Sequence, residues 1–233
     1  MNFKITTFDE PTINFRSENV YSPSDDTFLL IDYFKKTIRD SSFDGYSLKK
    51  VRYLLDMGTG TGIIAIYLKL LANKLINFNP KIYASDILKE AINCAKKNEK
   101  LNNTKGKIHF IHSNLFHSFP DKLQNKFNII IFNPPYLPAL EENGKKFFSD
   151  LDHSWSGGEM GYETLIEFFN EVLKFLNPAP NAVALIYYIT SSRVEKESIT
   201  EKLNYLGFQT EEVAKTHIFF EDIILNRATR NSL

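Results

Sequence analysis

The fold is decided by Val51-Arg-Tyr-Leu-Leu-Asp-Met57, which runs directly into Gly58-Thr-Gly-Thr-Gly62 and then into Ile63-Ile-Ala-Ile-Tyr-Leu-Lys-Leu-Leu-Ala-Asn-Lys-Leu75. The first run is apolar and ends in an acid, which predicts a buried strand. The glycines permit a tight turn close to a ligand, and the apolar periodicity after them predicts a helix. Strand, glycine loop and helix form the nucleotide-binding unit of a doubly wound α/β sheet, so Gly58 and Gly60 are candidate cofactor-binding residues. The spacing G-x-G-x-G differs from the G-x-G-x-x-G of a dinucleotide cradle, which disfavours NAD and FAD.

Apolar runs and helical patterns alternate on both sides of this unit, which predicts a single α/β domain over residues 1–233. Residues 1–48 are expected to form an N-terminal arm and helix that lead into the core. Two adjacent strands at the C-terminus predict an antiparallel hairpin, with an antiparallel member at one edge of a mostly parallel sheet. The seven predicted strands are residues 51–57, 81–86, 107–112, 127–132, 182–189, 209–215 and 218–225.

The composition excludes several classes of protein. The 233 residues include 28 Lys and Arg against 28 Asp and Glu, so net charge gives no general attraction to nucleic acid, although a local basic patch stays possible. The single cysteine, Cys94, rules out an internal disulfide or a cysteine metal cluster and fits a reducing compartment. No apolar run approaches the roughly 20 residues of a membrane span, and residues 1–10 lack the apolar core of a signal peptide. A cytoplasmic protein is therefore expected.

A second decisive stretch, Asn133-Pro134-Pro135-Tyr136, follows the predicted strand 127–132. Two prolines cannot continue a sheet, so the chain forms a stiff loop at the end of the sheet where ligands bind in α/β proteins. The Asn133 amide oxygen and the Pro134 carbonyl are two fixed acceptors that could hold both hydrogens of a planar –NH2 group. Tyr136 offers a flat face on which a planar group could stack. The alternative is a strand end followed by an ordinary proline-rich turn.

Other candidate residues each have a functional and a purely structural interpretation. Asp86 ends the second predicted strand, where a carboxylate can accept both ribose hydroxyls, or it caps the helix that follows. Asn114 could contact an adenine edge or simply form a turn. The cluster 21–27 precedes an apolar helix and can be explained by helix capping through Ser24 or Asp25.

These motifs occur in the order seen in S-adenosylmethionine-dependent amino-methyltransferases, and within that group the chain resembles the HemK-type release-factor glutamine methyltransferases. The resemblance rests on Leu55–Gly62, Asp86 and Asn133–Tyr136, together with Val20–Leu30, Phe132–Pro138 and Trp155–Gly161. Bacterial members carry a helical substrate domain before the glycine loop. Only 57 residues precede Gly58 here, so the chain resembles the short archaeal and eukaryotic branch.

The resemblance implies a Rossmann-like class I methyltransferase fold, with S-adenosyl-L-methionine as cofactor and a class 1 release factor as protein substrate. It also implies a small zinc-binding activator subunit as partner. Asp86 is expected to hold the ribose, Asn114 and Leu115 to flank the adenine, and Asp56, Gly58 and Thr27 to hold the methionine end. The family usually has an acid where this chain has Asn114, whose amide oxygen can still accept a hydrogen bond.

In this interpretation the catalytic residues are Asn133, Pro134, Pro135 and Tyr136, and Asn133 also borders the cofactor. Three alternatives remain open. An adenine-N6 or guanine-N2 methyltransferase of RNA or DNA would use the same acceptors, with Tyr136 stacking on a flipped base. A protein that binds without catalysis is disfavoured by the intact Asn133–Tyr136 stretch. A lysine methyltransferase is disfavoured because two planar acceptors suit an ammonium poorly.

Overall fold

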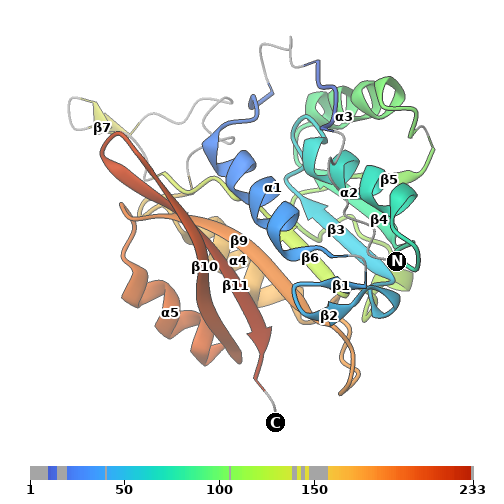
Figure 1. The fold of residues 1–233 in the computed structure, drawn as a ribbon. Coiled ribbons are helices and arrows are strands. Elements are labelled where there is room, and N and C mark those ends of the chain that lie inside the picture. Colours follow the sequence, from blue (N-terminus) through green and yellow to red (C-terminus); the bar gives the residue numbers. More distant parts are fainter. Residues whose placement is uncertain are drawn as a thin grey trace.

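The computed structural model describes residues 10–14, 20–39, 41–104, 106–137, 141–142, 145–146 and 157–231. They are arranged around a seven-stranded sheet with the order β10-β11-β9-β6-β3-β4-β5 (Figure 1). The strands of this sheet are β3 (Tyr53–Met57), β4 (Lys81–Asp86), β5 (Ile108–His112), β6 (Ile129–Phe132), β9 (Leu185–Ser191), β10 (Phe208–Ile218) and β11 (Glu221–Arg230). Two short hairpins lie outside it, β1 (Ser42–Phe43) with β2 (Tyr46–Ser47) and β7 (Glu141–Glu142) with β8 (Lys145–Lys146). The predicted seven-stranded α/β fold is confirmed.

In the seven-stranded sheet the neighbouring strands β5, β4, β3, β6 and β9 are all parallel. The two C-terminal strands, β10 and β11, form the predicted antiparallel hairpin. The position of the reversed strand differs from the prediction. It is β11, which lies between β9 and β10 and not at the edge of the sheet. The hairpin folds back so that the last strand pairs with the sheet on one side and with its own partner on the other, which leaves β10 as the edge.

Helices cover both faces of the sheet. Helices α1 (Asp25–Thr37), α2 (Ile63–Lys74) and α3 (Lys89–Leu101) precede the middle of the chain, and α4 (Glu163–Val172) and α5 (Lys196–Tyr205) follow it. Along β6, Ile129 and Ile131 belong to the core beneath α1 and α2, whereas Ile130 and Phe132 belong to the core beneath α4 and α5. This alternation follows from the period of two in a strand, and burial on both faces explains the continuous apolar runs in the sequence.

The strand register brings the candidate residues to one edge. Met57 of β3 lies beside Ser85 of β4 and Phe132 of β6. The glycine loop after β3, Asp86 at the end of β4 and the loop after β6 therefore meet at the carboxyl edge of the sheet, where α/β proteins bind ligands.

The described residues lack both a membrane-spanning helix and a metal-binding cluster. None of their helices is both long enough and apolar enough to cross a lipid bilayer. They also contain no group of three or more His, Cys, Asp and Glu residues placed to hold a metal ion.

Candidate active site

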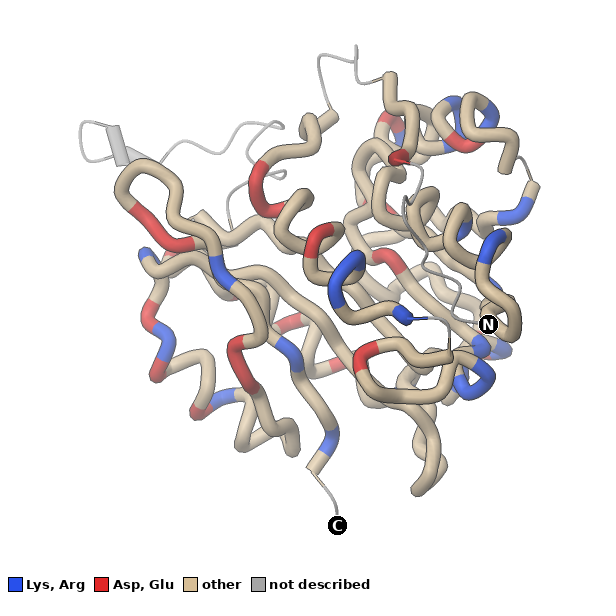
Figure 2. The backbone as a smooth tube through the Cα atoms, in the orientation of Figure 1, with Lys and Arg blue, Asp and Glu red and all other residues tan. Residues whose placement is uncertain are grey.

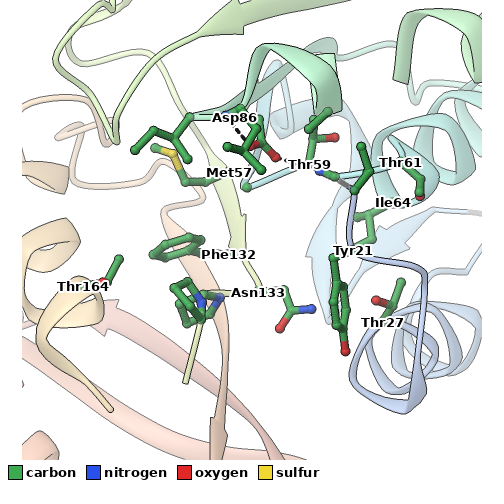
Figure 3. A pocket seen from close by; sticks show the side chains of 18 of the residues that line it. Tyr21, Thr27, Met57, Thr59, Thr61, Ile64, Asp86, Phe132, Asn133 and Thr164 are labelled. Carbon is green, nitrogen blue, oxygen red and sulfur yellow. Dashed lines mark hydrogen bonds between the residues drawn. The ribbon is translucent and has the colours of Figure 1, made fainter. Parts of the chain in front are cut away.

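A cavity of about 530 Å³ opens at the carboxyl edge of the sheet (Figure 3). Its volume is in the range of small-molecule and cofactor sites. The start of α1, the glycine loop, the ends of β4 and β6, the turn after β5 and one face of α4 all contribute to its wall. Of the residues predicted from the sequence, the wall includes Thr27, Gly58, Gly60, Asp86, Asn114, Leu115, Asn133, Pro134, Pro135 and Tyr136.

The glycine loop is held open by hydrogen bonds to the tip of β4. The Thr59 N–H donates to the Ser85 carbonyl at 2.9 Å, and the Gly60 N–H donates to Oδ2 of Asp86 at 2.9 Å. Gly58 and Gly60 have φ angles of +66° and +53°, a left-handed conformation that glycine adopts without steric cost. The glycines predicted from the sequence are therefore required by the path of the backbone along the cavity.

Asp86 connects the glycine loop to α3. Its second oxygen, Oδ1, accepts from the Leu88 N–H at 2.9 Å, just before the helix begins. Burial raises the pKa of this carboxyl, while its backbone hydrogen bonds oppose that shift. Each carboxylate oxygen has a second lone pair, so the side chain can accept ribose hydroxyls and still keep both backbone contacts. The structural and the functional interpretations of Asp86 are thus compatible.

Asp56 does not line the cavity, and its predicted contact with the methionine end of the cofactor stays a prediction. The side chain is only 1% exposed and turns toward α2. Its Oδ2 accepts from the Thr59 hydroxyl at 2.6 Å and from the Ala65 N–H at 3.2 Å. Burial raises the pKa of this carboxyl to about 7. Asp56 is a positioning residue that ties the glycine loop to the first turn of α2.

Asn133 carries the clearest unpaired acceptor of the site. Its Oδ1 is buried and has no hydrogen-bond partner among the described residues. In the close view the Asn133 side chain lies between Phe132 and Tyr21 (Figure 3). The neighbouring Pro134 carbonyl receives no backbone N–H from the described chain either. A buried acceptor without a donor is costly, so these two oxygens suit a ligand that supplies N–H groups.

Asp26 is a site residue that the sequence analysis did not single out. It is only 2% exposed, and its Oδ2 accepts from the Tyr21 and Tyr136 hydroxyls, each at 3.1 Å. Its Oδ1 accepts from the Thr27 hydroxyl at 3.1 Å. Burial, followed by the charge of Asp26, raises the pKa of both tyrosine hydroxyls, so they remain protonated donors. Asp26 thereby joins the segment before α1 to the loop after β6.

The sequence signal for Asp26 was hidden by the capping interpretation. Ser24 is the residue at the N-cap of α1, yet its side chain makes no capping hydrogen bond. Two acids directly before an apolar helix look the same whether they cap the helix or face a cavity. Only the tertiary contact with Tyr136, 110 residues away, separates the two.

The turn after β5 also reaches the cavity. The Asn114 backbone carbonyl accepts from the His117 N–H at 3.0 Å, which completes a turn and leaves the exposed Asn114 side chain at the cavity wall. Leu115 follows with a φ of +40°, and its side chain is buried. A left-handed leucine is uncommon and lies here at a ligand-sized cavity, as strained residues near functional sites often do.

The loop before α4 packs directly on the Asn133–Tyr136 stretch. The Gly157 N–H donates to the Leu137 carbonyl at 2.9 Å. A methyl group added at Gly157 would lie 2.5 Å from the Pro135 carbonyl oxygen, so this position has room only for glycine. Trp155, which belongs to the same predicted motif, lies outside the described residues.

Comparisons with known proteins agree with this geometry. Residues 29–151 match the family model described as the methyltransferase small domain. The solved E. cuniculi Mtq2–Trm112 complex, described as responsible for methylation of the eRF1 translation termination factor, has the same fold, with a TM-score of 0.61 and 19% identity over 92% of this chain and 99% of that one. The fold and the cavity together define a Rossmann-like methyltransferase that uses S-adenosylmethionine.

Two relatives narrow the assignment. A protein of Methanocaldococcus jannaschii, named as a candidate protein N5-glutamine methyltransferase, is 33% identical over 91% of this chain and 92% of its own length. The eRF1 methyltransferase catalytic subunit of Schizosaccharomyces pombe is 25% identical over 91% of this chain and 90% of its own length. The chain belongs to the methyltransferase small domain family, in the group of protein N5-glutamine methyltransferases.

Proposed function

We propose that this chain transfers a methyl group from S-adenosylmethionine to the side-chain amide nitrogen, N5, of the glutamine in the Gly-Gly-Gln motif of a class 1 release factor. The observation that carries the proposal is the buried Oδ1 of Asn133, which has no hydrogen-bond partner in the described part of the chain and lies beside the Pro134 carbonyl. These acceptors match the two N–H groups of a primary amide. The names of the relatives, which refer to glutamine N5 and to eRF1, point to the same substrate.

The chemical difficulty is that an amide nitrogen is a poor nucleophile because its lone pair is delocalised into the carbonyl. Asn133 Oδ1 and the Pro134 carbonyl each accept one amide N–H, which fixes the plane of the glutamine amide and directs the nitrogen lone pair out of that plane. Catalysis by these residues is positioning together with electrostatic stabilisation of the increasingly acidic N–H groups. No side chain needs to act as a strong base, because the amide proton can leave after the methyl group has been transferred.

The cofactor would occupy the remainder of the cavity, and when bound it supplies an electrophilic methyl group on sulfur. Asp86 would accept the ribose hydroxyls, and Asn114 and Leu115 would flank the adenine. The backbone of Gly58 and Gly60 and the Thr27 hydroxyl would hold the methionine end. The volume of about 530 Å³ and the left-handed glycines fit this arrangement.

A small zinc-binding activator is proposed as partner, and the solved structure of Mtq2 is likewise a complex, with Trm112. The edge strand β5 (Ile108–His112) offers a backbone edge that is unpaired among the described residues, and Phe110 and Ile111 on it are only partly buried. Because release factors act in translation, the proposed site of action is the cytoplasm.

Methylation of adenine N6 or guanine N2 in RNA or DNA is the second candidate, since an exocyclic amine presents the same two N–H groups. Lys and Arg are interspersed with Asp and Glu along the described backbone (Figure 2), which does not form the basic stripe expected of a nucleic-acid track. Glutamine is therefore the favoured acceptor.

The test is the Asn133→Ala variant, compared with wild type in methyl transfer to the release factor. The affinity for S-adenosylhomocysteine should change by no more than about threefold, because Asp86 and the glycine loop are untouched. The kcat should fall by about 100-fold or more, the usual effect of removing a transition-state hydrogen-bond acceptor or donor. A variant that retains full turnover would show that Asn133 does not orient the glutamine.

A further inference from the structure

The hairpin of β10 and β11 ends in two exposed phenylalanines. Ile218 pairs with Glu221, so Phe219 and Phe220 alone form the two-residue turn. Their exposed fractions are 88% and 89%. Two-residue hairpin turns favour Asn-Gly and similar pairs, and exposed large aromatic side chains are unfavourable in water. Neither the residue preferences of hairpin turns nor solubility therefore explains why two phenylalanines occupy this turn.

The backbone of this turn is strained as well. Phe219 has a φ of +49°, in the left-handed region that a bulky side chain rarely adopts. Glycine or asparagine at this position would relieve the strain. A residue that is strained in its backbone and unfavourably solvated in its side chain is typical of a functional contact.

The turn lies at the same end of the sheet as the catalytic loop. The register places Phe132 beside Tyr188, and Tyr188 beside Asn226. Asn133, one residue further along β6, is therefore level with Leu225 of β11, and Phe220 precedes Leu225 by five residues. At about 3.3 Å per residue, the tip projects about 16 Å beyond the level of Asn133, and two strand spacings of about 4.8 Å separate it sideways. Figure 1 shows the hairpin extending past the end of β9.

The charged residues around the tip are paired with one another. Asp222 contacts Lys215 at 3.4 Å and His217 at 2.8 Å. Glu221 contacts Arg193 at 3.5 Å and accepts a hydrogen bond from the Ser191 hydroxyl. The tip therefore presents an apolar surface on a base of mutually neutralised charges, which suits an apolar depression on a protein better than a row of phosphates.

We infer that the Phe219–Phe220 turn is a docking contact for the release factor. The turn would bind a surface of the release factor that lies about 2 nm from the methylated glutamine. This inference rests on the proposed function and adds how the enzyme selects a whole protein over an isolated Gly-Gly-Gln segment. The contact holds the folded substrate while the glutamine enters the cavity. It contributes to substrate affinity and leaves the chemical step unchanged.

The test compares Phe219→Gly combined with Phe220→Ser against the wild type, in the presence of the activator. The substrates are the full release factor and a short peptide that carries Gly-Gly-Gln. The matched control is Tyr205→Ser, which removes an aromatic ring that is 92% exposed at the end of α5. Tyr205 lies just before β10 begins, at the end of the hairpin opposite to the Phe219–Phe220 turn. The thermal midpoint should not fall in the double variant, because glycine tolerates the φ of Phe219.

For the double variant, kcat/KM with the release factor should fall about tenfold or more through KM, as for the loss of an aromatic hot spot, while kcat/KM with the peptide should stay unchanged. The Tyr205→Ser control should match wild type on both substrates. Unchanged kinetics with the release factor, an equal loss on the peptide, or a change of a wild-type dimer into a monomer would each overturn the docking inference alone. With total RNA as a third methyl acceptor, a fall in kcat/KM seen only on RNA would show that the rings stack on bases and would overturn the docking inference. A wild-type enzyme that leaves the glutamine of both substrates unmethylated would overturn the proposed function and this inference together.

Discussion

Substitution of Gly157 by alanine tests how tightly the loop before α4 controls the catalytic loop. The added methyl group would lie 2.3 Å from the Gly161 carbonyl oxygen and 2.5 Å from the Pro135 carbonyl oxygen. An ordinary carbon–oxygen contact is about 3.3 Å, so the Pro135 backbone has to move by about 0.8 Å. Both obstacles are backbone atoms, which cannot rotate away as a side chain would. Because a misplacement of about 1 Å at a reacting group can cost about 100-fold, the kcat should fall by roughly 10- to 100-fold.

The assay separates this effect from loss of the fold. Single-turnover methyl transfer to the release factor gives the rate of the chemical step. Titration with S-adenosylhomocysteine gives the affinity for the cofactor site, which should stay within about threefold of wild type because the glycine loop follows a different strand, β3. Thermal unfolding sets a temperature at which the variant is folded, since overpacking costs about 1–3 kcal/mol. Met160→Ala, in the same loop but half exposed, is the control and should keep wild-type kinetics. A Gly157→Ala enzyme with wild-type turnover would refute the claim that this contact positions Pro135.

Three further changes have defined outcomes. Asp56 has a raised pKa of about 7 against an ordinary value of 3.8, so its contribution to stability is complete below about pH 4 and is lost as the pH rises through 7. This loss approaches about 4 kcal/mol of unfolding free energy. Asp56→Asn should remove this part of the pH dependence of urea unfolding, and identical pH profiles of variant and wild type would contradict the assignment. In Gly62→Ala the added Cβ would lie 2.8 Å from the Ala95 side chain, and the φ at this position is +84°, so the variant should lose about 2–4 kcal/mol of unfolding free energy. The control is Gly45→Ala, where the φ is +82° but the added Cβ has open space, and it should lose only about 1–2 kcal/mol. Equal losses in the two variants would exclude the packing effect. Tyr136→Phe removes one hydrogen bond to the buried carboxylate at the start of α1 and should lower kcat/KM about tenfold with unchanged cofactor affinity, so wild-type kinetics would argue against a role for this bond.

The elements of the fold could be predicted because their signals are local. The glycine loop follows an apolar strand, and the period of the next helix is clear, so β3 and α2 were expected within a few residues of their observed bounds. The position of β11 inside the sheet could not be predicted, because it depends on which side of the hairpin pairs with β9. That choice is made by packing between distant segments and leaves no local trace in the sequence.

The site residues also divide into those that local sequence predicts and those whose placement depends on tertiary contacts. Ten of the predicted site residues line the cavity: nine of them follow or end a strand, where the sheet brings them together, and Thr27 lies at the start of α1. Asp56 also follows a strand pattern, but Thr59 and Ala65 turn its carboxylate away from the cavity. Asp26 was missed because its partner Tyr136 is far along the chain. A sequence shows which residues lie at an edge of the sheet, and tertiary contacts decide which way their side chains turn.

The central claim is that Asn133 and Pro134 orient a glutamine amide. The most direct measurement is methyl transfer from labelled S-adenosylmethionine, with the activator present, to the release factor, to the same factor with its Gly-Gly-Gln glutamine changed to alanine, and to total RNA. Label on the unmodified factor that disappears in the glutamine variant is the predicted result. Label that persists in the variant, or that appears only on RNA, would contradict glutamine as the acceptor.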